Sequence, residues 1–129
     1  RLATDAEMES WWGQHPDWGI AVATGKLSNL VVIDVDSNKP DCAGYPLEPG
    51  ETEVPWTVTS RTGSGGEHYF FHYPKGVEVR NSESVIATSV DVRGEGGYVV
   101  LPPSRSETGE YQWINAPYGI NAVEIAELC

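Results

Sequence analysis

The chain has 129 residues, a hydrophobic fraction of 40%, a charged fraction of 21% and a net charge of −11. These values are typical of one globular domain, so we expect a single domain over residues 1–129. They exclude a membrane-spanning helix, because no apolar run approaches the roughly 20 residues required, and they argue against general affinity for nucleic acid. Residues 61–105 depart from the acidic balance: they hold five acidic and five basic residues, which suits a phosphate-binding site.

One helix and two strands are predicted before residue 37. Thr4 and Glu7 have the spacing of a capping box, which predicts a short helix directly after Thr4. Residues 19–24 (GIAVAT) and 30–36 (LVVIDVD) predict two strands joined by a hairpin-sized loop. Residues 37–55 are rich in proline, glycine and acidic residues, so we expect a long, poorly packed surface excursion there.

The rest of the chain predicts further strands and a closing helix. Strand patterns occur at residues 56–60, 67–73, 76–80 and 110–114. Residues 88–104 predict a hairpin, in which SVDVR and GYVVL flank a GEGG turn. Asn121 and Glu124 have capping spacing, which predicts a final helix over AVEIAEL. A helix, several strands and a second helix indicate the α+β class with a mixed or mainly antiparallel sheet.

Ionisable side chains gather on one face of three predicted strands. Successive residues of a strand point to opposite faces, so Asp34 and Asp36 share a face, with apolar neighbours on the other. By the same rule Asp91 and Arg93 share a face of their strand, and His68 points to one face of the strand 67–73. If these strands are neighbours, three carboxylates form a cluster with His68 and Arg93 at its margin.

A cluster of carboxylates calls for a positive partner, since like charges so close repel each other. Hard cations such as Mg²⁺ or Mn²⁺ prefer oxygen ligands, and two of them about 3.5–4 Å apart can clamp an in-line phosphoryl displacement. Arg93 and His68 would then neutralise phosphate oxygens. A D-x-D pair also occurs at solvated strand ends, in haloacid-dehalogenase-type phosphatases and in sugar-nucleotide transferases, so the motif alone leaves these alternatives open.

Three motifs in order resemble a known family. VVIDVD, SGGEHYFF and VDVRGEGGYVVLPPS are similar to the bifunctional DNA primase/polymerase (Prim-Pol) domain of the archaeo-eukaryotic primase superfamily. This domain occurs in phage, plasmid and prophage replication proteins, and the likeness covers roughly residues 4–114. The resemblance implies that Asp34, Asp36 and Asp91 are catalytic metal ligands, that His68 contacts the nucleotide's phosphates, and that Arg93 is placed for a triphosphate contact.

The resemblance also implies a fold and shows two departures. The implied fold is the superfamily's primase-polymerase catalytic core, an RRM-like mixed sheet packed with a second α/β unit, with the active site between them. Many members have a serine two positions before the histidine, where this chain has Gly66, with Ser64 four before, which suits the Gly-Gly variant of the motif. We expect the loop of Ser64, Gly65 and Gly66 to bind nucleotide, because its glycines let the chain approach the phosphates closely. The family domain usually begins earlier, so we expect this domain to be incomplete at its N-terminus.

The expected function is template-directed DNA primase/polymerase activity. The implied cofactors are two Mg²⁺ or Mn²⁺ ions, and the implied partners are a DNA template and primer, dNTP or NTP and a fused or associated helicase, without a membrane. Two alternatives stay open: an inactive nucleotide-binding module of the same fold, and a metal-dependent phosphatase or nuclease. The distant Cys42 and Cys129 form neither a disulfide framework nor a zinc motif, so we expect a cytoplasmic protein with reduced thiols.

Overall fold

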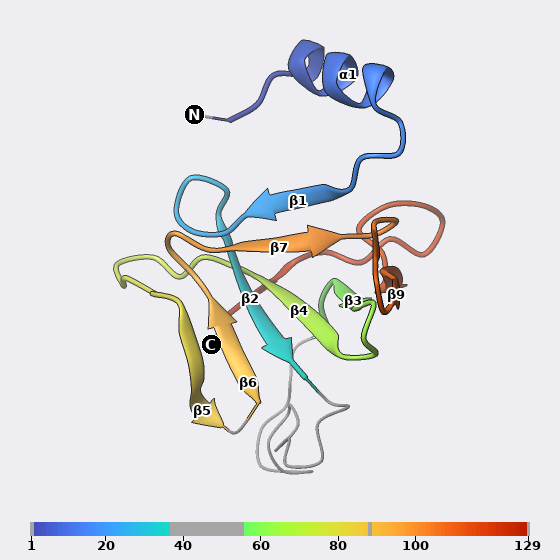
Figure 1. Ribbon diagram of the computed structural model, residues 1–129. Coiled ribbons are helices and arrows are strands. Elements are labelled where there is room, and N and C mark those ends of the chain that lie inside the picture. The colour runs from blue at the N-terminus through green and yellow to red at the C-terminus, as the bar shows by residue number, and fades with distance from the viewer. Residues whose placement is uncertain (1, 37–55, 88, 129) are drawn as a thin grey trace.

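The computed structural model describes residues 2–36, 56–87 and 89–128, and Figure 1 traces them in chain order. Within these ranges the chain forms one helix, α1 (Asp5–Gln14), and eleven strands. The strands are β1 (Ile20–Ala23), β2 (Leu30–Val35), β3 (Thr59–Arg61), β4 (Glu67–His72), β5 (Ser82–Ala87), β6 (Val90–Arg93), β7 (Tyr98–Leu101), β8 (Arg105–Ser106), β9 (Gly109–Glu110), β10 (Gln112–Asn115) and β11 (Ala126–Glu127). The predicted excursion over residues 37–55 lies outside the described residues.

Helix α1 begins at the predicted capping box. The Thr4 hydroxyl accepts a hydrogen bond from the backbone N–H of Glu7, and the Glu7 carboxylate accepts one from the backbone N–H of Thr4, both at 3.1 Å. No residue of α1 is buried, and the helix lies beyond β1 at the edge of the molecule (Figure 1). None of the described helices is long and apolar enough to cross a membrane.

The main sheet has seven strands in the order β10-β3-β4-β2-β6-β5, with β11 beside β4. All of its pairs are antiparallel except β11 with β4. Strand β2 lies between β4 and β6 and alternates between two cores: Val31, Ile33 and Val35 pack on one face, and Val32 packs on the other. The structure therefore confirms the α+β class with a mainly antiparallel sheet, while the superfamily's core arrangement stays a prediction.

A smaller sheet of β1 and β7 covers one face of the main sheet (Figure 1). Val99 of β7 is buried against Val32 of β2 and Phe70 of β4. The predicted hairpin of residues 19–24 with 30–36 is therefore wrong, because β1 pairs with β7 and β2 pairs with β4 and β6. A single bridge between Gly25 and Leu30 is the contact that links the two strands.

The predicted hairpin over residues 88–104 is also wrong, because its two strands belong to different sheets. Strand β6 buries Val90 and Val92 in one core, whereas β7 buries Val99 in the other. A turn joins them, in which Gly97 donates its N–H to the carbonyl of Gly94, but the two strands diverge and do not pair. Glu95 donates its N–H to the carbonyl of Val79 instead, and Gly97 accepts from Thr24.

The predicted helix at residues 122–128 and the predicted strand at residues 76–80 are also wrong. In both places the pairing with distant parts of the chain decides the local structure. Residues 122–128 form no helix: Val123 and Ile125 pack on one core and Ala126 and Leu128 on the other, an alternation that suits the short parallel strand β11. The edge strand predicted at residues 76–80 is reduced to a bridge from Arg80 to Glu95, and the strand lies later, as β5.

Candidate functional site

Four polar side chains form a row across the main sheet. Ser60 of β3 lies opposite His68 of β4, His68 lies opposite Asp34 of β2, and Asp34 lies opposite Asp91 of β6. Residues directly opposite each other on antiparallel strands project from the same face. The shared face predicted for Asp34, His68 and Asp91 is therefore the arrangement in the structure.

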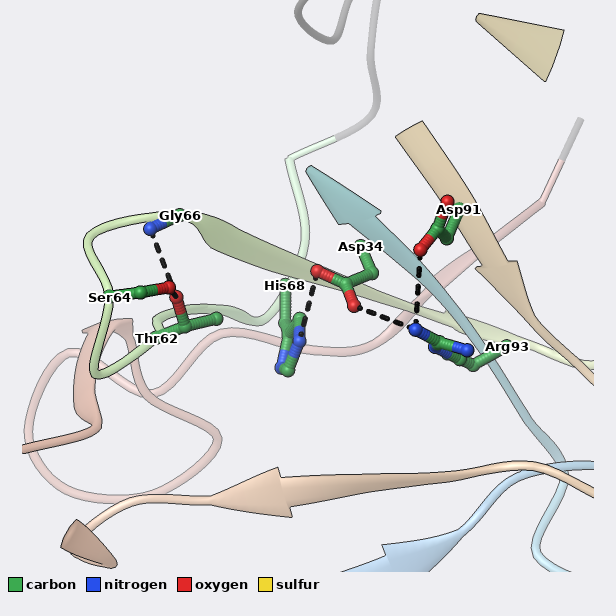
Figure 2. A network of polar contacts seen from close by, with 7 residues as sticks. All are labelled: Asp34, Thr62, Ser64, Gly66, His68, Asp91 and Arg93. Carbon is green, nitrogen blue, oxygen red and sulfur yellow. Dashed lines mark hydrogen bonds and ion pairs between the residues drawn. The ribbon is translucent and has the colours of Figure 1, made fainter. Parts of the chain in front are cut away.

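Asp34 is the centre of an ionic network in this row (Figure 2). The His68 Nε2 atom lies 3.3 Å from Asp34 Oδ1, and the Arg93 Nη2 atom lies 3.4 Å from Asp34 Oδ2. The same Arg93 nitrogen lies 3.3 Å from Asp91 Oδ2. About a quarter of the side chain is exposed in each of Asp34, Asp91 and Arg93, so the network is accessible to a ligand.

The two basic side chains control the ionisation of Asp34. Its burial alone would raise the pKa of the carboxyl group, but the hydrogen bond and charge of His68, together with those of Arg93, outweigh burial and lower the pKa below its usual value of 3.8. Nearby, burial and then the negative charge of Asp34 raise the pKa of the Tyr111 hydroxyl. Asp34 is therefore held as a carboxylate, which is the form that accepts hydrogen bonds or a cation.

The lowered pKa predicts a pH-dependent contribution of Asp34 to stability. A carboxyl group whose pKa is lower in the folded state stabilises the fold above its unfolded pKa and loses that contribution as the pH falls through the folded value. We expect wild-type protein to lose stability below about pH 4 more steeply than Asp34→Asn, measured as the free energy of urea unfolding between pH 7 and pH 2. Asp17→Asn, at an exposed loop position, is the matched control and should follow the wild type. Identical curves for Asp34→Asn and wild type would contradict this assignment.

A cavity of about 300 Å³ adjoins the network between the main sheet and β7. Its walls include Asp34, His68, Arg93, Asn81, Tyr98 and Tyr111. Sequence reasoning missed Asn81, which lies just outside the strand predicted at residues 76–80. It also missed Tyr111, although that residue lies within the strand predicted at residues 110–114. The one signal available for Tyr111 was therefore the alternation of side chains within that strand.

Four of the predicted site residues do not line this cavity. Asp36 follows β2, is half-buried, and donates its N–H to the carbonyl of Ser89. The loop Ser64, Gly65 and Gly66 is braced by Thr62, whose hydroxyl oxygen lies 3.2 Å from Ser64 Oγ and accepts from Gly66 N at 2.9 Å (Figure 2). None of these four predicted residues is among those lining the cavity, and their role in binding stays a prediction.

The site has carboxylate oxygens that could bind a divalent cation, but Arg93 now contacts both carboxylates. Asp34 and Asp91 present carboxylate oxygens, the donors that Mg²⁺ and Mn²⁺ prefer. Arg93 Nη2 lies within 3.4 Å of an oxygen of each and is the positive group that these carboxylates now share. Among the described residues no group of three or more His, Cys, Asp or Glu side chains has the geometry to hold a metal ion. Asp34 and Asp91 therefore supply oxygen donors of the type that a hard cation prefers, but they do not form a metal site as arranged here, and metal binding stays a prediction.

Gly66 supports the site through its lack of a side chain. A Cβ atom there would collide with the carbonyl oxygen of Val35 and meet the Cα atom of Asp36 at 3.4 Å. Gly66→Ala should therefore push β4 away from β2 and reduce the free energy of unfolding by about 1–3 kcal/mol, measured by chemical denaturation. Gly13→Ala, in α1 with no atom within 4 Å of the added Cβ, should leave stability unchanged or slightly higher. Equal stability of Gly66→Ala and wild type would contradict the close contact.

Comparison with known proteins identifies the family. The sequence model described as the N-terminal domain of bifunctional DNA primase/polymerase, Prim-Pol, matches residues 2–129. No curated protein matches the chain. The match spans almost the whole sequence, including the three motifs on which the resemblance rested and the ionic network that they form. The chain therefore belongs to the Prim-Pol family of bifunctional DNA primase/polymerase N-terminal domains, which gives it a primase/polymerase-type function.

Proposed function

We propose that the chain catalyses template-directed nucleotidyl transfer, with Asp34, Asp36 and Asp91 holding two divalent metal ions and His68 and Arg93 binding the triphosphate. The observation that carries this proposal is the convergence of Asp34, Asp91, His68 and Arg93 in one network beside a cavity, in a chain of the Prim-Pol family. Bound Mg²⁺ or Mn²⁺ would lower the pKa of a primer 3′-hydroxyl and stabilise the charge on the leaving pyrophosphate.

The cationic side chains account for recognition of the nucleotide. Arg93 is a rigid multi-donor group that suits phosphate oxygens, and its present partners are two carboxylates that a metal ion would take over. We propose that it moves from the carboxylates to the phosphates when substrate and cation enter together. His68 presents Nε2 on the same face, close enough to Asp34 to reach a phosphate bound beside that carboxylate.

The negative charge of the site explains why the aspartates would bind the metal ions while Arg93 and His68 bind the phosphates. A triphosphate is repelled by Asp34 and Asp91 unless positive charge lies between them, and Arg93 is the one Lys or Arg residue that lines the described cavity. Nucleotide and metal ion are therefore expected to bind cooperatively, each reducing the electrostatic cost of the other. The setting in a phage, plasmid or prophage replication protein with a helicase is a proposal that rests on the resemblance.

Incubation with labelled dNTP, primed DNA template and Mn²⁺ tests the proposed function. We expect extension of the primer with release of pyrophosphate, and an unprimed template measures chain initiation separately. Nucleotide binding without turnover would support the inactive module instead. Release of inorganic phosphate or a cut strand would support a phosphatase or nuclease on the same carboxylates.

A further inference from the structure

Three buried polar atoms lie next to one another in the sheet without a hydrogen-bond partner. They are Ser60 Oγ, His68 Nδ1 and Trp113 Nε1. Among the described side chains, these are the buried nitrogen and oxygen atoms that make no hydrogen bond. Trp113 of β10 lies opposite Ser60 of β3, and Ser60 lies opposite His68 of β4. The three therefore continue the row of Asp34 and Asp91 on its other side.

Cross-strand pairing places the three residues side by side on one face of the sheet. Opposite residues on antiparallel strands have Cβ atoms about 4.5–5.5 Å apart and point to the same face. Phe70 packs against two of them, with its ring centroid 6.3 Å from that of His68 and 5.9 Å from that of Trp113. Ser60 is fully buried and His68 is 5% exposed, so bulk solvent does not satisfy their polar atoms.

The hydrogen-bonding capacities of the three atoms are complementary. Trp113 Nε1 can only donate, the Ser60 hydroxyl can donate and accept, and His68 Nδ1 accepts when the ring proton is on Nε2. That tautomer is the one that lets Nε2 donate to Asp34, 3.3 Å away. A water molecule needs two to four polar partners in a buried site, and three are present here.

We propose that Trp113, Ser60 and His68 form a buried site for one water molecule, and that Ser60 acts through this water as a positioning residue for His68. The water accepts from Trp113 Nε1, exchanges a hydrogen bond with Ser60, and donates to His68 Nδ1. The hydrogen bond from the water to Nδ1 fixes the ring proton on Nε2, which then faces Asp34. The step from there to the phosphates of the nucleotide rests on the proposed function. The second histidine of β4 has a comparable arrangement without water, because His72 Nδ1 lies 3.1 Å from Asn29 Nδ2.

Long-range ¹H–¹⁵N correlation spectra of the ¹⁵N-histidine-labelled protein at pH 8 test the inference without nucleotide or metal. The wild type should show His68 as one tautomer, protonated on Nε2, with the Nδ1 shift of a hydrogen-bond acceptor. Ser60→Ala should give a mixture of tautomers at His68, leave the His72 signals in place, and weaken nucleotide binding about tenfold. Trp113→Phe, which keeps an aromatic ring and removes the N–H, should shift His68 Nδ1 in the same direction.

Ser104→Ala is the matched control for a purely structural effect. Ser104 is buried and hydrogen-bonds to the backbone of Ile20, so its loss should lower stability while the His68 tautomer stays unchanged. A mixture of tautomers in the wild type would overturn the inference, whatever the variants do. An unchanged His68 spectrum in both Ser60→Ala and Trp113→Phe would also overturn it. Failure of the proposed function would appear instead as absent primer extension by the wild type, with these spectra unaffected.

Discussion

Asp34→Asn is expected to reduce primer extension by about a thousandfold. Asp34 contacts both His68 and Arg93, so neutralising it removes a predicted cation ligand and releases the two groups that we assign to the triphosphate. Asparagine has the same size, so the sheet should remain intact. The measurement is the steady-state rate of extension on a primed template with Mn²⁺, compared with wild type.

Asp17→Asn is the control for this substitution, because it also removes one negative charge but lies in an exposed loop away from the network. It should extend primers at the wild-type rate. Circular dichroism should show that both variants are folded. A folded Asp34→Asn variant with more than about a tenth of the wild-type rate would contradict the role of Asp34.

His68→Ala is expected to weaken nucleotide affinity and to cut extension by about a hundredfold or more, while Mn²⁺ binding in the absence of nucleotide stays nearly intact. The reason is chemical: hard cations choose the carboxylates, so the imidazole is free to donate to a phosphate oxygen. Isothermal titration gives the Mn²⁺ and nucleotide dissociation constants separately, and a primer assay gives the rate.

His72→Ala is the matched control on the same strand. His72 lies opposite Leu30, its Nδ1 atom contacts Asn29, and it lines a different cavity beside Pro117. Its loss should therefore change extension much less than the loss of His68. Similar behaviour of the two variants, or loss of Mn²⁺ binding in His68→Ala, would show that the role assigned to His68 is wrong.

The local part of the site could be predicted from the sequence because strand alternation is a strict geometric rule. It placed Asp34 on the polar side of an otherwise buried strand, and it placed Asp91 and Arg93 together on a second strand. The capping box at Thr4 was likewise predictable, since its hydrogen bonds lie within four residues. Both signals are contained in short stretches of chain.

Pairing between distant strands was not predictable in the same way. The spacing of Asn121 and Glu124 is a genuine capping signal, yet β11 forms there because Ala126 pairs with Phe71 and its neighbours pack on two cores. Residues 88–104 likewise contain a clear turn sequence, GEGG. Their two strands are nevertheless separated, because Val92 and Val99 are buried in cores on opposite faces of the main sheet. Packing overrides local preference in both places.

Ser60 shows the limit most clearly. Alternation within the predicted strand at residues 56–60 puts Ser60 on the face of the buried Val58, so its direction could have been inferred. Its position opposite His68 depends on the register of β3 against β4, which no single sequence specifies. The network beyond the aspartates therefore became visible only in three dimensions.

A crystal structure with Mn²⁺ and a non-hydrolysable dNTP is the most direct test of the central claim, that this network is a metal-dependent nucleotidyl-transfer site. The anomalous signal of manganese should lie between the carboxylates of Asp34 and Asp91. The Arg93 guanidinium, now bridging these two groups at 3.4 and 3.3 Å, should have turned to the phosphates. Manganese or nucleotide bound elsewhere, with Arg93 still bridging Asp34 and Asp91, would contradict the claim.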